Sequence, residues 1–144
     1  MTYQAPRELL DQLKRDEGLR LTVYADTLGH PTIGYGRALD TKGISRAEAE
    51  MLLTHDILDA AAEVETRFAW AGIEAFGEAR RGVLINMTFN LGINGLLGFV
   101  RMLDAAESGD YDRAAAEMMD STWATQVGPR AHRLARQMQT GAGQ

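Results

Sequence analysis

The sequence predicts an α+β fold, in which a small β-hairpin lobe at about residues 18–43 joins a mostly helical body at about 45–140. One short stretch rich in β-branched and aromatic residues follows the first helical pattern, and nearly every later segment has helical periodicity. The chain has 144 residues, 45% apolar and 24% charged, which suits one globular domain with its own core. We therefore expect residues 1–144 to form a single domain.

The first helix begins near Pro6, a residue suited to a first helical turn, and its leucines recur at helical spacing. Gly18 is placed just past the helix end, where a positive φ costs glycine nothing. Glu17 then falls in the last turn, where the negative end of the helix dipole disfavours a carboxylate by a few tenths to about 1 kcal/mol. Functional residues often break such local rules.

Residues 21–25 and 31–36 predict the two strands of a hairpin, because a turn-rich linker separates them. Alternation along the second strand places Thr32, Gly34 and Gly36 on one face. Two glycines leave that face bare, so another group can approach the backbone closely.

The rest of the chain is predicted to be helical. A capping box at residues 45–48 begins a helix that carries residues 49–57, and another helix begins before Val64. Residues 82–92 are apolar on most sides, which predicts a central buried helix. Three further short helices are expected, at 96–107, 111–120 and 130–139.

Composition narrows the possible functions. The chain has no cysteine, and its three histidines lack ligand spacing, so we expect no metal and no cofactor. No run of about 18 apolar residues and no signal peptide is present, so we expect no stable membrane insertion. The net charge of −5 argues against a nucleic acid partner. Residues 121–144 carry three arginines and no acid, which indicates either a solvated helix face or a cationic end that meets an anionic polymer.

Glu17, Asp26 and Thr32 surround the junction between helix and hairpin and form the candidate catalytic group. In glycoside hydrolysis, one carboxylic acid protonates the leaving oxygen while a second carboxylate activates water or attacks the sugar. The hairpin can fold Asp26 back towards Glu17, with the Thr32 hydroxyl holding a water beside Asp26. On spacing alone, two carboxylates near a hairpin are more often surface charge.

Three stretches carry a resemblance to a known family. DEGLRLTVYADTLGHPTIGYG at 16–36 resembles the signature of the phage-type lysozymes, glycoside hydrolase family 24. RRGVLINMTFNLG at 80–92 resembles their buried central helix, and residues 98–141 resemble their C-terminal helices. The resemblance implies a muramidase and phage endolysin that cuts the β-1,4 bond between N-acetylmuramic acid and N-acetylglucosamine of bacterial peptidoglycan. It implies Glu17 as general acid, with Asp26 and Thr32 handling the water of an inverting reaction.

The resemblance also implies Phe89 and Asn90 as a sugar-contacting pair and Arg130 as an arginine that approaches Glu17. The alternatives are that Phe89 belongs to the core and that Arg130 belongs to a solvated face. We further expect a monomer that resides in the host cytoplasm and reaches the cell wall only after a separate holin permeabilises the membrane.

Two departures from the family pattern concern the hairpin. Members related to the T-even phage enzyme have a histidine where this chain has Arg37, and a permanent cation near Glu17 works against an acid role. That objection disappears if Arg37 pairs elsewhere, for instance with Asp40. The stretch 37–44 is also shorter than in those members, so we expect an edge strand to be lost.

Two other functions remain open on the sequence. The chain can be a catalytically silent binding module that kept the lysozyme frame, although intact Glu17, Asp26 and Thr32 count against it. It can also be another glycosidase of lysozyme-like fold, such as a chitinase or chitosanase, with different contacts to the sugar.

Overall fold

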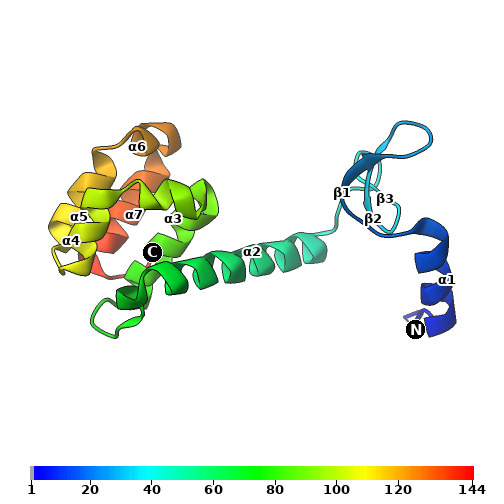
Figure 1. Ribbon diagram of the computed structural model, residues 1–144, viewed down its shortest axis with the longest axis horizontal. Helices are drawn as coiled ribbons and strands as arrows, with labels where there is room; N and C mark the ends of the chain where they lie inside the picture. The colour runs from blue at the N-terminus through cyan, green and yellow to red at the C-terminus, as the bar shows by residue number, and fades with distance from the viewer. Residues whose placement is uncertain (1) are drawn as a thin grey trace. The chain divides into compact units, whose positions relative to one another are not determined.

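The computed structural model describes residues 2–144 and divides the chain into two compact units, one up to Met51 and the other from Leu52 to Gln144. Helices dominate, and the described strands form one small antiparallel sheet in the first unit (Figure 1). The predicted α+β class is therefore confirmed.

In the first unit, helix α1 (Arg7–Glu17) begins after Pro6, whose carbonyl accepts hydrogen bonds from the next turn. The helix ends at Gly18, which has φ +72° and donates its N–H to the carbonyl of Lys14 at 3.0 Å. Glu17 is the last helical residue, as predicted. A glycine in the positive-φ region thus sets where the Glu17 side chain leaves the helix.

The sheet has the order β1 (Arg20–Ala25), β2 (Pro31–Gly34), β3 (Arg37–Ala38), and both pairs are antiparallel. Thr32 lies on the central strand opposite Tyr24 of β1 and is only 3% exposed. Pairing on both sides of β2 therefore holds the backbone of Thr32 in the middle of the sheet.

The second predicted strand was too long at its end. It stops at Gly34 because Tyr35 and Gly36 turn the chain into β3, and Gly34 and Gly36 both have a positive φ. The expected loss of an edge strand was wrong, since β3 remains as a two-residue strand paired with β2.

Helix α2 (Arg46–Arg67) opens with the predicted capping box. The Glu48 N–H donates to the Ser45 hydroxyl at 3.1 Å, and the Ser45 N–H donates to the Glu48 carboxylate at 3.0 Å. The prediction of a second helix before Val64 was wrong, because α2 is continuous through it. No glycine or proline lies within these 22 residues, so nothing in the backbone interrupts the helix.

The second unit is built around α3 (Glu78–Leu97), the predicted central helix. Val83, Leu84 and Met87 are fully buried in it, and the helix is broken at Gly92, which has φ +76° and ψ 162°. The remaining elements are η1 (Ala69–Gly72), α4 (Val100–Glu107), α5 (Tyr111–Met119), α6 (Thr122–Val127) and α7 (Pro129–Thr140). Helix α5 packs against α4 and α7, and α7 also contacts α3 and α6 (Figure 1).

The helix predicted over 96–107 was wrong, because the chain leaves helical geometry between α3 and α4 at Phe99, with φ −81° and ψ 56°. The Phe99 ring packs edge-on against Trp123 with 5.8 Å between centroids, so tertiary packing accompanies the break. Within residues 2–144, no single helix is long and apolar enough to cross a membrane. Helices α3 and α4 taken together have the length and composition of a membrane span, but the pair is bent by 102°.

Arg80 connects the start of α3 to the end of α7. Its guanidinium donates to the carbonyls of Met138 at 2.7 Å and Gln139 at 3.2 Å, and it lies 3.5 Å from the centre of the Tyr111 ring. The last carbonyls of a helix have no partner within the helix. Arg80 supplies donors to two of them and so anchors the end of α7.

Candidate active site

Glu17 lies directly against Gly36, the glycine of the turn between β2 and β3. A methyl group at Gly36 would lie 2.6 Å from Glu17 Oε2 and 3.0 Å from its carboxyl carbon. Gly36 also has φ +74°, which side-chain-bearing residues rarely adopt. The close approach predicted for the two hairpin glycines therefore occurs at Gly36, in the turn after β2 and not on the strand face, and the approaching group is the carboxylate of Glu17. Within the described residues, and apart from its chain neighbours, no heavy atom lies within 4 Å of a methyl group placed at Gly34.

Asp26 follows β1 directly, and backbone amides hold its carboxylate. Its Oδ1 accepts hydrogen bonds from the N–H groups of Leu28 at 2.9 Å and His30 at 2.8 Å. The bond from the His30 amide is the largest of the influences that lower the pKa of Asp26 below its usual value, with smaller contributions from Leu28 and from the His30 side chain. Asp26 is therefore a fixed, ionised carboxylate at neutral pH.

Thr32 meets Asp26 at the peptide group of His30. The Thr32 hydroxyl donates to the His30 carbonyl at 2.9 Å, and the N–H of Asp26 donates to the same carbonyl, also at 2.9 Å. A hydroxyl has one proton to donate and two lone pairs to accept with. Because the proton of Thr32 is used, its oxygen is left with acceptor capacity suited to holding a water molecule.

Arg37 is paired away from the candidate acid. Its guanidinium makes a two-point contact with Glu48, at 2.9 and 3.0 Å, and donates to the carbonyl of Gly43 at 3.0 Å. Asp40, the partner suggested from the sequence, is instead 3.2 Å from the His30 ring. The suggested partner was therefore wrong, but Arg37 does pair away from Glu17. Because Glu48 balances the charge of Arg37, the objection to Glu17 as an acid is weakened.

The Arg37–Glu48 pair predicts an acid-dependent loss of stability. The hydrogen bonds from Arg37, followed by those from Ser45, lower the pKa of Glu48 from 4.5 to about 2. Because the pKa of Glu48 is lower in the folded chain than in the unfolded chain, the ionised Glu48 stabilises the fold above pH 4.5. This stabilisation is lost as the pH falls towards about 2. We expect Glu48→Gln to have a lower melting temperature than the wild type at pH 7, with a difference that shrinks across this window.

Melting curves recorded from pH 7 to pH 2 measure this difference. Glu65→Gln, an exposed glutamate on the same helix, serves as the matched control and is expected to melt like the wild type. A deficit of Glu48→Gln that stays constant down to pH 2 would contradict the role of the ion pair.

The predicted sugar-contacting residues Phe89 and Asn90 lie on α3 in the second unit. Phe89 is 46% exposed, so it is not a core residue. It lines a groove of about 560 Å³ whose opposite wall carries Asp56, Asp59 and Glu63 of α2. The amide oxygen of Asn90 accepts a hydrogen bond from the buried Trp123 indole at 2.8 Å, which fixes the orientation of the Asn90 side chain.

Arg130, on the first turn of α7, is held within the second unit by Asn86. Its Nε and Nη2 both donate to the Asn86 side-chain oxygen, at 3.0 and 2.7 Å. A surface arginine anchored by two hydrogen bonds has a defined direction. Arg130 is half-buried and is therefore more than a member of a freely solvated face.

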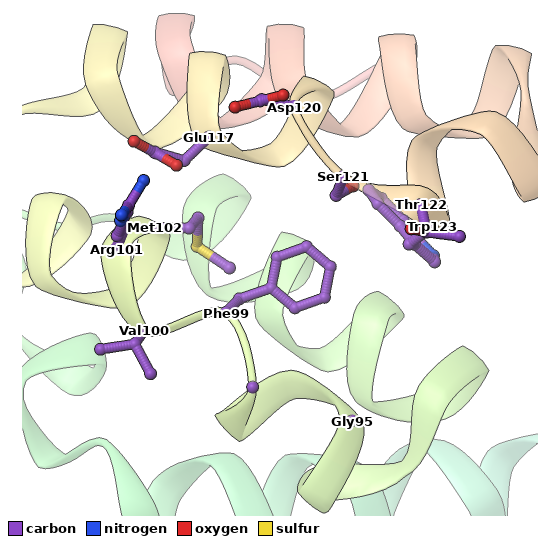
Figure 2. A pocket seen from close by; sticks show the side chains of 11 residues that line it. Gly95, Phe99, Val100, Arg101, Met102, Glu117, Asp120, Ser121, Thr122 and Trp123 are labelled. Atoms are coloured by element: carbon purple, nitrogen blue, oxygen red, sulfur yellow. The ribbon is translucent and has the colours of Figure 1, made fainter.

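A separate pocket of about 510 Å³ opens between the α3–α4 junction and the α5–α6 segment (Figure 2). Phe99 and Trp123 supply aromatic surface to it, and Arg101, Glu117 and Asp120 supply its charges. None of the six residues predicted for catalysis or sugar binding lines this pocket. Within residues 2–144, no three or more His, Asp or Glu side chains gather in an arrangement suited to a metal ion.

Two residues that hold the candidate side chains were not predicted from the sequence. His30 was not singled out, yet its backbone holds both Asp26 and Thr32. Asn86 was not singled out, although it anchors Arg130. Neither residue carries a sequence signal, because backbone hydrogen bonds are independent of residue type and the Asn86 contact spans 44 residues.

Comparisons with known proteins agree with this fold. The family model described as phage lysozyme matches residues 14–139. The chain is 30% identical over 158 residues to probable T4-type lysozyme 1 of Dictyostelium discoideum, covering 91% of this chain and 93% of that protein. It is 29% identical over 110 residues to the endolysin of Acyrthosiphon pisum secondary endosymbiont phage 1, covering 74% and 72%.

A further relative is much longer. The pre-baseplate central spike protein Gp5 of Enterobacteria phage T4 is 30% identical over 159 residues, which cover 92% of this chain but only 28% of that protein. The fold and these matches define a lysozyme-type peptidoglycan hydrolase. The chain belongs to the phage lysozyme family.

Proposed function

We propose that this protein is a muramidase that hydrolyses the β-1,4 bond between N-acetylmuramic acid and N-acetylglucosamine in bacterial peptidoglycan. The observation that carries the proposal is the placement of the Glu17 carboxylate on Gly36, in the same unit as the amide-held Asp26 and the buried Thr32. A pair of carboxyl groups is what glycoside hydrolysis commonly uses, and the Thr32 hydroxyl has acceptor capacity for the attacking water.

In the proposed reaction, Glu17 donates its proton to the glycosidic oxygen as the bond from that oxygen to the sugar C1 breaks. A water held by Asp26 and Thr32 attacks C1 from the opposite face and loses a proton towards Asp26, which inverts the configuration. The lowered pKa of Asp26 makes it a weak base, so it mainly orients the water. That is sufficient when the sugar already has oxocarbenium character in the transition state.

We propose Phe89, Asn90 and Arg130 as substrate-binding residues. The exposed Phe89 ring offers an apolar face on the wall of a groove. The Asn90 amide can bind an acetamido or hydroxyl group, and its orientation is fixed by Trp123. Arg130 presents a cation whose direction is fixed by Asn86.

We also propose that the protein acts as an endolysin, the name carried by one of its relatives. In this role a monomer accumulates in the host cytoplasm and reaches the wall once a separate holin has permeabilised the membrane. Fractionation of cells that express the protein alone tests the location: it is expected in the cytosolic fraction, and spontaneous lysis would contradict it.

Digestion of purified peptidoglycan tests the bond that is cut. The new reducing ends are reduced with borohydride and identified by mass spectrometry, with chitin and chitosan as parallel substrates. A muramidase yields reduced muramic acid ends, and a chitinase-like or chitosanase-like enzyme cuts one of the control polymers. A silent binding module sediments with the wall and yields no new ends.

The arginines of α7 are expected to fall into two groups by their response to salt. Arg130→Ala should lower activity at every ionic strength, because its side chain is held by Asn86 and is proposed to bind the substrate directly. Arg133→Ala and Arg136→Ala should lower activity only at low salt, since attraction to an anionic wall over more than about 8–10 Å is screened near 0.15 M.

Rates of wall clearing from about 0.01 to 0.3 M salt measure the difference. If all three defects fade together as salt rises, Arg130 acts only as surface charge. If none of the variants shows a defect, the basic end is a solvated face with no part in binding.

A further inference from the structure

The backbone N–H and carbonyl of His30 connect the two residues proposed to handle the water. The N–H donates to Asp26 Oδ1 at 2.8 Å. The carbonyl accepts from the Asp26 N–H and from the Thr32 hydroxyl, each at 2.9 Å. The backbone of a single residue, His30, therefore fixes the position of the Asp26 carboxylate and the orientation of the Thr32 hydroxyl.

The His30 side chain anchors this backbone to another part of the hairpin lobe. Its Nδ1 lies 3.2 Å from Oδ2 of Asp40, which follows β3. An ionised carboxylate only accepts hydrogen bonds, so Nδ1 carries the proton in this contact. The ring thereby ties the β1–β2 loop to the segment beyond β3, across a separation of ten residues.

Backbone hydrogen bonds to Asp26 hold the loop from within, but the tip of the loop has little side-chain packing. Its tip residue Leu28 is 81% exposed, and the following Gly29 has φ +85°. An exposed tip that ends in glycine has little packing to hold it, and such segments open at low cost in free energy. The His30–Asp40 contact is therefore well placed to hold the loop in the conformation that carries Asp26.

We propose that His30 is a positioning residue for the hydrolysis. Its backbone holds Asp26 and Thr32, and its imidazole anchors that backbone to Asp40. This inference rests on the proposed roles of Asp26 and Thr32. The charged groups that face the ring in the described chain are Asp40 and Asp26.

The electrostatics support the same role. The hydrogen bond and charge of Asp40, with a smaller contribution from Asp26, raise the pKa of His30, so its protonated form is favoured. The His30 charge in turn is one of the influences that lower the pKa of Asp26. Replacing His30 by alanine should therefore raise the pKa of Asp26 as well as loosen the loop.

The test compares His30→Ala, Asp40→Asn and the double variant on soluble peptidoglycan fragments. For each enzyme, kcat and KM are measured separately from about pH 3 upwards. His132→Ala, at an exposed histidine of α7, is the matched control. We expect His30→Ala to lower kcat by about 10–100-fold with little change in KM, since small misplacements of reacting groups cost rates of this order. Asp40→Asn should cost less, and the double variant should be no slower than His30→Ala.

The acid limb of the pH profile separates positioning from a general loss of structure. Activity falls as Asp26 takes up a proton, so a raised Asp26 pKa moves this limb of kcat to higher pH in His30→Ala. The limb stays in place in His132→Ala. If His30→Ala does not fold, as judged by circular dichroism, Asp40→Asn carries the test through a smaller loss of kcat with the acid limb unmoved, because His30 keeps its charge at the pH of that limb. An Asp40→Asn enzyme with the kcat of the wild type would then overturn the inference.

A His30→Ala enzyme that folds, keeps kcat within about twofold of the wild type and leaves the acid limb unmoved would overturn the inference. So would additive losses in the double variant, because they would mean that His30 and Asp40 act independently. Glu17→Gln in the same assay separates the two proposals. An active Glu17→Gln defeats the proposed function, whereas an inactive Glu17→Gln beside an unaffected His30→Ala defeats only the inference.

Discussion

Glu17→Gln is expected to lower the rate of peptidoglycan hydrolysis by about 10²–10⁴-fold while the protein stays folded. The amide matches the carboxyl group in size and in hydrogen bonding but has no acidic proton to give to the leaving oxygen. Its position at the end of α1 against Gly36 is compatible with an amide, since glycine has no side chain to oppose one. Initial rates of wall clearing, with circular dichroism as the check on folding, measure the effect.

Asp16→Asn is the matched control, because Asp16 is the exposed acid one residue earlier on the same helix. It is expected to keep wild-type activity, which would show that the loss follows from Glu17 and not from the charge of the helix end. A Glu17→Gln variant that retains more than about a tenth of wild-type activity would remove Glu17 from the role of acid.

Gly36→Ala is expected to cause the second large loss, through displacement of Glu17. The added methyl group would lie 2.6 Å from Glu17 Oε2, and the carboxylate is the end of a flexible side chain, so it moves and the backbone stays. A shift of about 1 Å in a reacting group can cost roughly 100-fold in rate. The positive φ of Gly36 adds a strain of about 1–2 kcal/mol, which lowers stability modestly.

Gly109→Ala separates the two effects, because Gly109 has φ +82° but open space where a methyl group would go. It should lose a similar amount of stability in urea unfolding and keep wild-type activity. Equal activity losses in the two variants would mean that strain alone explains the result. Full activity in Gly36→Ala would mean that the contact with Glu17 has no catalytic importance.

The position of Glu17 could be predicted from the sequence because its signals are local. Gly18 marks the end of α1, and a carboxylate in the last helical turn contradicts the helix dipole. The glycines of the hairpin likewise predicted a close approach to the backbone. That the approaching group is Glu17 could not be predicted, because Gly36 is nineteen residues further along the chain.

Partners chosen by tertiary structure were harder to predict. The capping box predicted the local hydrogen bonds of Glu48 with Ser45. Glu48 also forms an ion pair with Arg37, and Asp40 contacts His30 instead of Arg37. The end of α3 shows the same limit for backbone structure. Gly98 keeps helical dihedral angles there, and the chain turns at Phe99, a residue with no breaking tendency of its own.

The configuration of the new reducing end tests most directly whether Glu17 acts as the acid while Asp26 and Thr32 hold the attacking water. Proton NMR spectra of soluble peptidoglycan fragments, recorded early in the reaction, show which anomer forms before mutarotation mixes the two. We predict that the α-anomer of the new muramic acid end appears first, because water attacks from the face opposite the departing oxygen. A β-anomer that appears first would contradict this assignment, since retention of configuration requires that a carboxylate or the acetamido group of the substrate attacks C1 before the water does.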